Sequence, residues 1–255
     1  MALNAHTVTT RKLPRYYPRE FSVGVDLGQT TDYTAMVVLQ KTVLPPETAM
    51  FSPVGESPEN RLVEGRVSFD VVYATRVKDR RLTDIAREVL SRVIKLAPLT
   101  AFDQIGTISL AVDGTGMGRT AIDVFTEEME WRRRRREYMP QIDFRPVNWR
   151  GSNESMQRPK KDGDYWPVPW AQAVWPTVVA FQEDKIRIAK SAKDRDQLIH
   201  EIKSFRMKKP NRPDGPEKYE AWRQKDHDDL LAALTLAYWL WWYKRKGSRK
   251  LRILR

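Results

Sequence analysis

Acidic residues stand at the ends of three separate segments of this 255-residue sequence. Asp26 closes the alternating apolar run that begins at Phe21, and Asp113 closes a second apolar run, Ile105–Asp113. The third position is a cluster before an apolar helical segment: Asp226, Asp228 and Asp229. Carboxylates that converge repel one another unless cations neutralise them, and all-oxygen ligand sets favour Mg²⁺ or Mn²⁺. Two such ions about 4 Å apart can activate water and stabilise the leaving oxygen in phosphodiester cleavage.

Each acid also has a structural interpretation. Asp226 can cap a helix, and Asp228 and Asp229 in its first turn can interact favourably with the helix dipole. Asp113 can set the geometry of a turn. Asp26 is the hardest to explain in this way, because a carboxylate at the end of a buried strand needs a partner. The helical pattern does not decide between Asp228 and Asp229.

The segments around the acids indicate an α/β fold. Residues 21–40 predict a strand hairpin, and 67–77, 105–113 and 142–149 predict three further strands. A glycine-rich turn and a helix, 119–129, follow the strand that ends at Asp113, so this strand is expected parallel to the first one. The remaining predicted helices span residues 82–96, 169–182, 194–207 and 226–243. We therefore expect a mixed five-stranded central sheet flanked by helices, with residues 150–167 as a loop and 186–189 as a short connection.

Composition limits the partners. The chain carries 45 Lys and Arg against 33 Asp and Glu, a formal net charge of +12, which favours a polyanion such as nucleic acid. It has no cysteine, which excludes a thiolate metal site, and its three histidines leave little scope for a His-rich one. No apolar run reaches the length of a membrane span. We expect a basic arm over residues 1–20, one domain over 21–243 and a basic tail over 244–255, in the cytoplasm.

Three motifs together resemble the nuclease domain of phage terminase large subunits. They read VGVDLGQTTDYTAMVV, LAVDGTGMGRTAIDVF and KDHDDLLAALTLAYWLWW, and they follow one another in the order found in that family. The resemblance implies an RNase H-like fold, related to RuvC resolvases, and metal-dependent cleavage of double-stranded concatemeric DNA during genome packaging. It places the catalytic metal ligands at Asp26, Asp113 and Asp229, with Asp228 as the second choice for the third ligand. It also implies supporting roles beside them for Asp32 and His227.

The sequence departs from a full terminase large subunit. It contains no G-x-x-x-x-G-K-[ST] phosphate loop, the signature of the ATPase domain that comes first in that family. The chain therefore resembles the nuclease half alone. The resemblance implies a terminase ATPase domain or subunit, a small terminase subunit and a portal as partners, in the cytoplasm of an infected host.

Several basic segments are candidates for phosphate contacts, although a charge run is more often solvated surface. The densest follows Trp131, and others lie in the loop after residue 149. The residues we expect to bind DNA are Arg132, Arg133, Arg134, Arg150, Lys160 and Lys161.

Three alternatives stay open on the sequence. The stretch VGVDLGQTT also resembles the phosphate-binding hairpin of actin and sugar-kinase ATPases, which use two such domains around a nucleotide. A RuvC-like junction resolvase would share the same fold. A non-catalytic nucleic-acid-binding subunit would use the basic surface alone, with the acids in structural roles.

Overall fold

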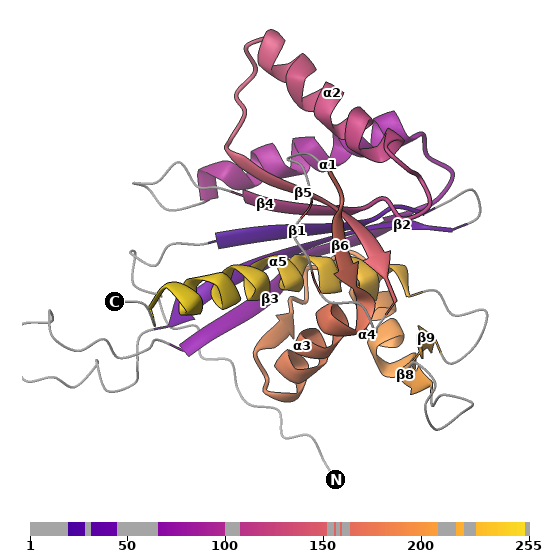
Figure 1. The fold of residues 1–255 in the computed structure, drawn as a ribbon, viewed down its shortest axis with the longest axis vertical. Coiled ribbons are helices and arrows are strands. Elements are labelled where there is room, and N and C mark those ends of the chain that lie inside the picture. Colours follow the sequence, from indigo (N-terminus) through magenta and orange to yellow (C-terminus); the bar gives the residue numbers. More distant parts are fainter. Residues whose placement is uncertain are drawn as a thin grey trace, which may run out of the picture.

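The computed structural model of the chain describes residues 20–28, 32–44, 66–99, 108–151, 156, 159, 164–208, 218–221 and 228–252. Its centre is a seven-stranded sheet (Figure 1). The strands are β1 (Glu20–Asp26), β2 (Thr34–Leu44), β3 (Arg66–Val77), β4 (Ile108–Asp113), β5 (Ile142–Arg150), β6 (Trp166–Pro169) and β7 (Ile186–Ile188). A separate two-stranded ribbon pairs β8 (Phe205–Lys208) with β9 (Lys218–Ala221).

The order across the sheet is β6-β5-β4-β1-β2-β3-β7. β2 runs antiparallel to both of its neighbours, and every other pair in the sheet is parallel. The central order β3-β2-β1-β4-β5, with β2 alone reversed, is the topology of the RNase H-like fold, as predicted. The strand count of five was wrong, because β6 and β7 extend the sheet at its two edges.

Helices cover both faces of the sheet (Figure 1). They are α1 (Leu82–Leu96), η3 (Ala97–Leu99), α2 (Thr120–Arg134), α3 (Trp170–Gln182), α4 (Arg195–Ser204) and α5 (Asp229–Arg252). α1 and α2 pack on the face formed by Val23, Val25 and Leu110, whereas α5 packs on the opposite face, with α3 and α4 beside it. No helix among the described residues is long and apolar enough to cross a bilayer.

The last helix differs from the prediction at both ends. It begins at Asp229 instead of 226, and it continues to Arg252, through most of the segment expected as a tail. Leu230, Leu234 and Trp239 are fully buried, as expected for a helix that is apolar on nearly all sides. This burial makes α5 the element that covers the centre of the sheet.

Candidate active site

Asp26 and Asp113 lie side by side at the ends of two adjacent parallel strands. The register pairs Asp26 of β1 with Asp113 of β4. Side chains alternate between the faces of a strand, so both acids lie on the face opposite to Val25 and Val112, which join the core under α1 and α2. Both acids therefore lie on the face that α5 covers, and neighbouring strands are only about 4.8 Å apart.

Asp229 reaches the same place because α5 passes very close to β1. A Cβ atom on Gly24 would lie 1.9 Å from the carbonyl oxygen of Ala233 and 2.7 Å from the amide nitrogen of Ala237. Gly24 and Asp26 are on the same face of β1, and Ala233 is one helical turn after Asp229. The missing side chain at Gly24 thus allows the first residue of α5 to approach the two strand-end acids. We call Asp26, Asp113 and Asp229 the acidic triad.

The electrostatics of the triad are unfavourable for three ionised carboxylates. Loss of solvent raises the pKa of Asp26 well above its ordinary value, and the charges of Asp113 and Asp229 raise it further. Burial also raises the pKa of Asp113, against the effect of the hydrogen bonds that it accepts. The interaction between the two side chains raises the pKa of Asp26 and lowers that of Asp113. A carboxyl pair in this arrangement holds a proton between its members, and a bound cation would serve the same purpose.

The turn after β4 fixes the orientation of Asp113. The backbone N–H of Thr115 donates to Asp113 Oδ1 at 2.8 Å, and the Thr115 hydroxyl donates to the same oxygen at 2.5 Å. The N–H of Trp149, near the end of β5, donates to the Thr115 hydroxyl at 2.8 Å. Asp113 is only 7% exposed, so these bonds hold a carboxylate that has little other solvation. Sequence reasoning missed Thr115, although a hydroxyl two residues after a strand-end acid is typical of such a turn.

The other residues predicted near the metal ligands are Asp228, Asp32 and His227. Asp228 is partly buried, and its charge adds less to the shift at Asp26 than the charge of Asp229 does. Asp32 is exposed, in the connection between β1 and β2. His227 lies outside the described residues, as does Asp226.

The triad suits a hard cation by its chemistry, since all its donors are carboxylate oxygens. Among the residues that the structure describes, however, no group of three or more His, Asp or Glu side chains is already arranged to hold a metal ion. Metal binding would therefore need side-chain adjustments only, because the backbone register already brings Asp26 and Asp113 together.

The basic residues predicted to bind DNA lie in different environments. Arg132 is buried, with Nε 2.8 Å from Glu128 Oε1 and Nη2 donating to Ser91 Oγ at 3.0 Å. It joins α2 to α1, and this inward position leaves it unsuited to a phosphate contact. Arg133 and Arg134 are exposed at the end of α2, which runs away from the acidic triad.

Among the described residues predicted as phosphate contacts, Arg150 lies at the end of the sheet where the acids lie, on the strand next to β4. It is exposed, and it stands three residues beyond Val147, the register partner of Asp113. Lys160 and Lys161 lie outside the described residues.

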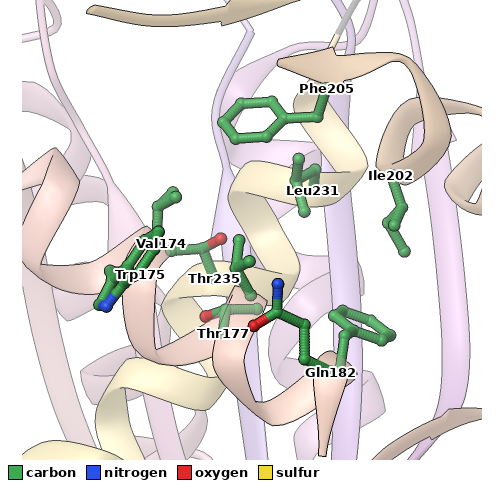
Figure 2. Close-up of a pocket in the computed structure, with 10 residues that line it drawn as sticks. Val174, Trp175, Thr177, Gln182, Ile202, Phe205, Leu231 and Thr235 are labelled. Atoms are coloured by element: carbon green, nitrogen blue, oxygen red, sulfur yellow. The ribbon is translucent and has the colours of Figure 1, made fainter. Parts of the chain in front are cut away.

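A cavity of about 270 Å³ lies on the far side of α5 from β1, between α3, α4 and α5. Figure 2 shows its lining, which includes Trp175, Phe205 and Leu231. Its lining contains no acid, lysine or arginine.

Comparisons with known proteins gave similar structures only. No protein-family model and no curated protein sequence matches the chain. The chain is similar to the large terminase nuclease from thermophilic phage G20c, with 14% identity, 86% of this chain and 81% of that one covered, and a TM-score of 0.46. It is also similar to the human cytomegalovirus terminase nuclease domain, Mn soaked, at 12% identity, 89% and 84% coverage and a TM-score of 0.48. The chain is also similar to Thermus thermophilus RuvC, with 11% identity, 89% of this chain and 96% of that one covered, and a TM-score of 0.33.

Proposed function

We propose that this protein is a divalent-metal-dependent endonuclease that hydrolyses phosphodiester bonds of double-stranded DNA. The observation that carries the proposal is the in-register pair Asp26 and Asp113, which meets the start of α5 at Asp229. Asp113 and Asp229 are buried and Asp26 is partly buried, and acids gathered in this way are costly for folding and often mark functional sites. The formal net charge of +12 supports a polyanionic substrate.

Each member of the acidic triad has a defined task in this proposal. Asp26 and Asp113 would provide carboxylate oxygens to two Mg²⁺ or Mn²⁺ ions, and Asp229 would complete the ligand set from α5. Asp229 is favoured over Asp228, because it is buried and interacts more strongly with Asp26. When bound, the ions would lower the pKa of a water molecule and stabilise the leaving oxygen of the phosphodiester. Thr115 orients Asp113 through its two hydrogen bonds.

The biological setting of the proposal comes from the motif resemblance. A terminase nuclease cuts concatemeric viral DNA during packaging, in the host cytoplasm, together with an ATPase, a small subunit and a portal. We propose the same setting for this chain. Arg150 is the described basic residue that we propose as a phosphate contact, because it is exposed at the end of the sheet that carries Asp26 and Asp113.

The test compares Asp26→Asn and Asp113→Asn with wild type in Mn²⁺-dependent cleavage of linear double-stranded DNA. Replacing a direct ligand should reduce the rate by more than the factor of about 100 that residues behind a metal ligand can cost. Asp84→Asn is the matched control, because Asp84 is a partly exposed acid of α1, on the other face of the sheet. Undiminished cutting by a pure Asp26→Asn protein would overturn the assignment.

Cleavage of branched and linear DNA distinguishes a junction resolvase from a packaging nuclease. A junction resolvase should cut a four-way junction faster than a linear duplex of the same sequence, whereas the packaging nuclease should cut the linear duplex at least as fast. Retained DNA binding without cleavage in Mg²⁺ or Mn²⁺ would instead favour a non-catalytic subunit.

A further inference from the structure

Glu201 of α4 is a buried acid that the proposed chemistry does not use. It is 1% exposed, which makes it one of the most deeply buried charged side chains among the described residues. A carboxylate in such a position is strongly disfavoured unless specific partners hold it. Gln197 of α4 itself donates to Glu201 Oε1 at 3.3 Å, and the other partners come from α5 and β3.

The first partner is the beginning of α5. Glu201 Oε2 accepts a hydrogen bond of 3.0 Å from the backbone N–H of Leu231. The first N–H groups of a helix have no acceptor within the helix, and a side chain near its start usually supplies one. Here the acceptor comes from a different helix, and the N–H that it binds is two residues after Asp229. Glu201 therefore holds the turn of α5 that carries the third acid of the triad.

Apolar packing between α4 and α5 is incomplete at this point. Ile202 and Phe205, at the end of α4, and Leu231 of α5 line the cavity of about 270 Å³, and Figure 2 shows them around it. Since a cavity lining lacks the close contacts of a packed interface, side chains there constrain a neighbouring helix less. The hydrogen bond from Leu231 to Glu201 is accordingly a principal tie between the two helices at the start of α5.

Glu201 also interacts with Arg76 of β3. Glu201 Oε1 lies 3.9 Å from Arg76 Nη1, and the Arg76 guanidinium lies over the ring of Tyr33, 4.4 Å from its centroid. Arg76 pairs with Ala35 in the sheet, and Ala35 pairs with Asp26 on its other side. The backbone N–H of Arg76 also donates to Asp194 Oδ2 at 2.7 Å, just before α4 begins. Helix α4 is thus tied to the sheet beside Asp26 and to the start of α5.

We propose that Glu201 is a positioning residue, which holds the first turn of α5 so that Asp229 meets Asp26 and Asp113. This inference rests on the proposed nuclease function. Gly24 determines how closely α5 approaches β1, whereas Glu201 fixes the position of its first turn. Without Glu201, the fold would retain the Asp26–Asp113 pair, but the third ligand would be held less well and divalent cations would bind more weakly.

The test measures the Mn²⁺ dissociation constant by isothermal titration calorimetry, on proteins shown to be folded by circular dichroism. Glu201→Ala should weaken Mn²⁺ binding by about 10- to 100-fold, the range found for residues that act behind a metal ligand. Glu201→Asp keeps the charge but shortens the reach to Leu231, so it should weaken binding by about 10-fold. Glu201→Gln keeps a carbonyl acceptor for Leu231 and should stay within about threefold of wild type. His200→Ala, an exposed neighbour on α4, is the matched control and should not change the affinity.

Cleavage supplies a second readout, because a positioning residue acts through the metal. The Mn²⁺ concentration for half-maximal cutting should rise in Glu201→Ala by the same factor as the dissociation constant, with the rate largely restored at saturating Mn²⁺. Folded Glu201→Ala or Glu201→Asp with wild-type Mn²⁺ affinity would overturn the inference and leave the nuclease proposal intact. Should Glu201→Ala fail to fold, Glu201→Asp decides the question. A wild-type protein that neither binds Mn²⁺ nor cuts DNA would overturn both proposals.

Discussion

Two groups of buried charged side chains, on opposite faces of the sheet, illustrate two ways in which a fold can contain charge. Between α1 and α2, Arg132 is surrounded by Glu128, Glu137 and the Ser91 hydroxyl, so opposite charges and hydrogen bonds compensate it. Beneath α5, the acidic triad brings together charges of one sign, and the pKa values of Asp26 and Asp113 rise. The first group combines both signs of charge, whereas the acids of the triad repel one another and would be stabilised by a proton or a cation. Charge compensation therefore separates the structural site from the candidate functional one.

The compensated group should be important for stability alone. Arg132→Ala leaves Glu128 with 12% side-chain exposure and without its main partner, so the free energy of unfolding should fall by about 3 kcal/mol. Mn²⁺-dependent cleavage by the folded fraction should not change. Urea denaturation and a cleavage assay check the two statements, and a specific loss of DNA cutting at unchanged stability would contradict the contrast.

The substitution Gly24→Ala tests the comparison at the acidic triad. Gly24→Ala places a Cβ 1.9 Å from the Ala233 carbonyl oxygen, so α5 must move away from β1. We expect about 3 kcal/mol lower stability from overpacking and weaker Mn²⁺ binding, because Asp229 moves with the helix. Gly151→Ala is the matched control, since a Cβ there would meet nothing within 4 Å and should leave both measurements unchanged.

Glu201 is intermediate between the compensated Arg132 group and the acidic triad. It is buried, and its ion-pair partner Arg76 lies 3.9 Å away. Burial is the main cause that raises its pKa from 4.5 to about 7. From pH 4.5 to 7 the folded state keeps a proton that the unfolded chain has released, so the free energy of unfolding falls as the pH rises. The fall attributable to Glu201 is about 3 kcal/mol at most, and Glu201→Gln should lack it. The difference between urea denaturation curves of the two proteins, measured at both pH values, checks this.

A cation should compensate the triad as Glu128 compensates Arg132. Mn²⁺ at about 100 times its dissociation constant should stabilise the wild-type fold by about 2.7 kcal/mol. Asp26→Asn should gain far less from Mn²⁺, yet its metal-free form should be more stable than wild type, because an amide avoids the cost of a carboxyl group whose pKa burial and the neighbouring acids raise. Thermal unfolding with Mn²⁺ and with a chelator measures both effects. An equal Mn²⁺ response in the two proteins would place the ion elsewhere.

The smallest effects concern the exposed arginines. Arg150→Ala should lower the slope of log K against log salt by about 1, because one phosphate contact near the triad is lost. Arg133→Ala, at the distant end of α2, should leave the slope unchanged. Fluorescence anisotropy with a DNA duplex at several salt concentrations measures it, and equal slopes for Arg150→Ala and wild type would remove Arg150 from the proposed interface.

The sequence predicted the central part of the fold well, because alternation of apolar residues and strand-end acids are local signals. β1, β2 and β4 follow this pattern, and their register places Asp26 beside Asp113 as the parallel arrangement required. The beginning of β6 was expected in the loop of residues 150–167 and its last residue, Pro169, at the start of a helix; the strand Trp166–Pro169 contains two prolines. Proline is tolerated there because β6 is an edge strand.

Features that depend on tertiary contacts could not be predicted from local sequence patterns. Ile186–Ile188 was expected as a short connection, and it forms β7 only through pairing with β3. Glu201 looked like any polar position of an amphipathic helix, and its burial arises from α5 and Arg76. The same reason applies to Gly24, whose close approach to Ala233 has no signature in the sequence around it.

The in-register pairing of β1 with β4 also has a consequence for how the protein folds. Asp26, Asp113 and Asp229 are far apart in the sequence, so the proposed metal ligands meet only after two long loops have closed. Contacts at such sequence separation form slowly compared with helices and hairpins. A refolding chain should therefore acquire its helical circular dichroism before its capacity to bind Mn²⁺, which makes cation binding a reporter of the final assembly step.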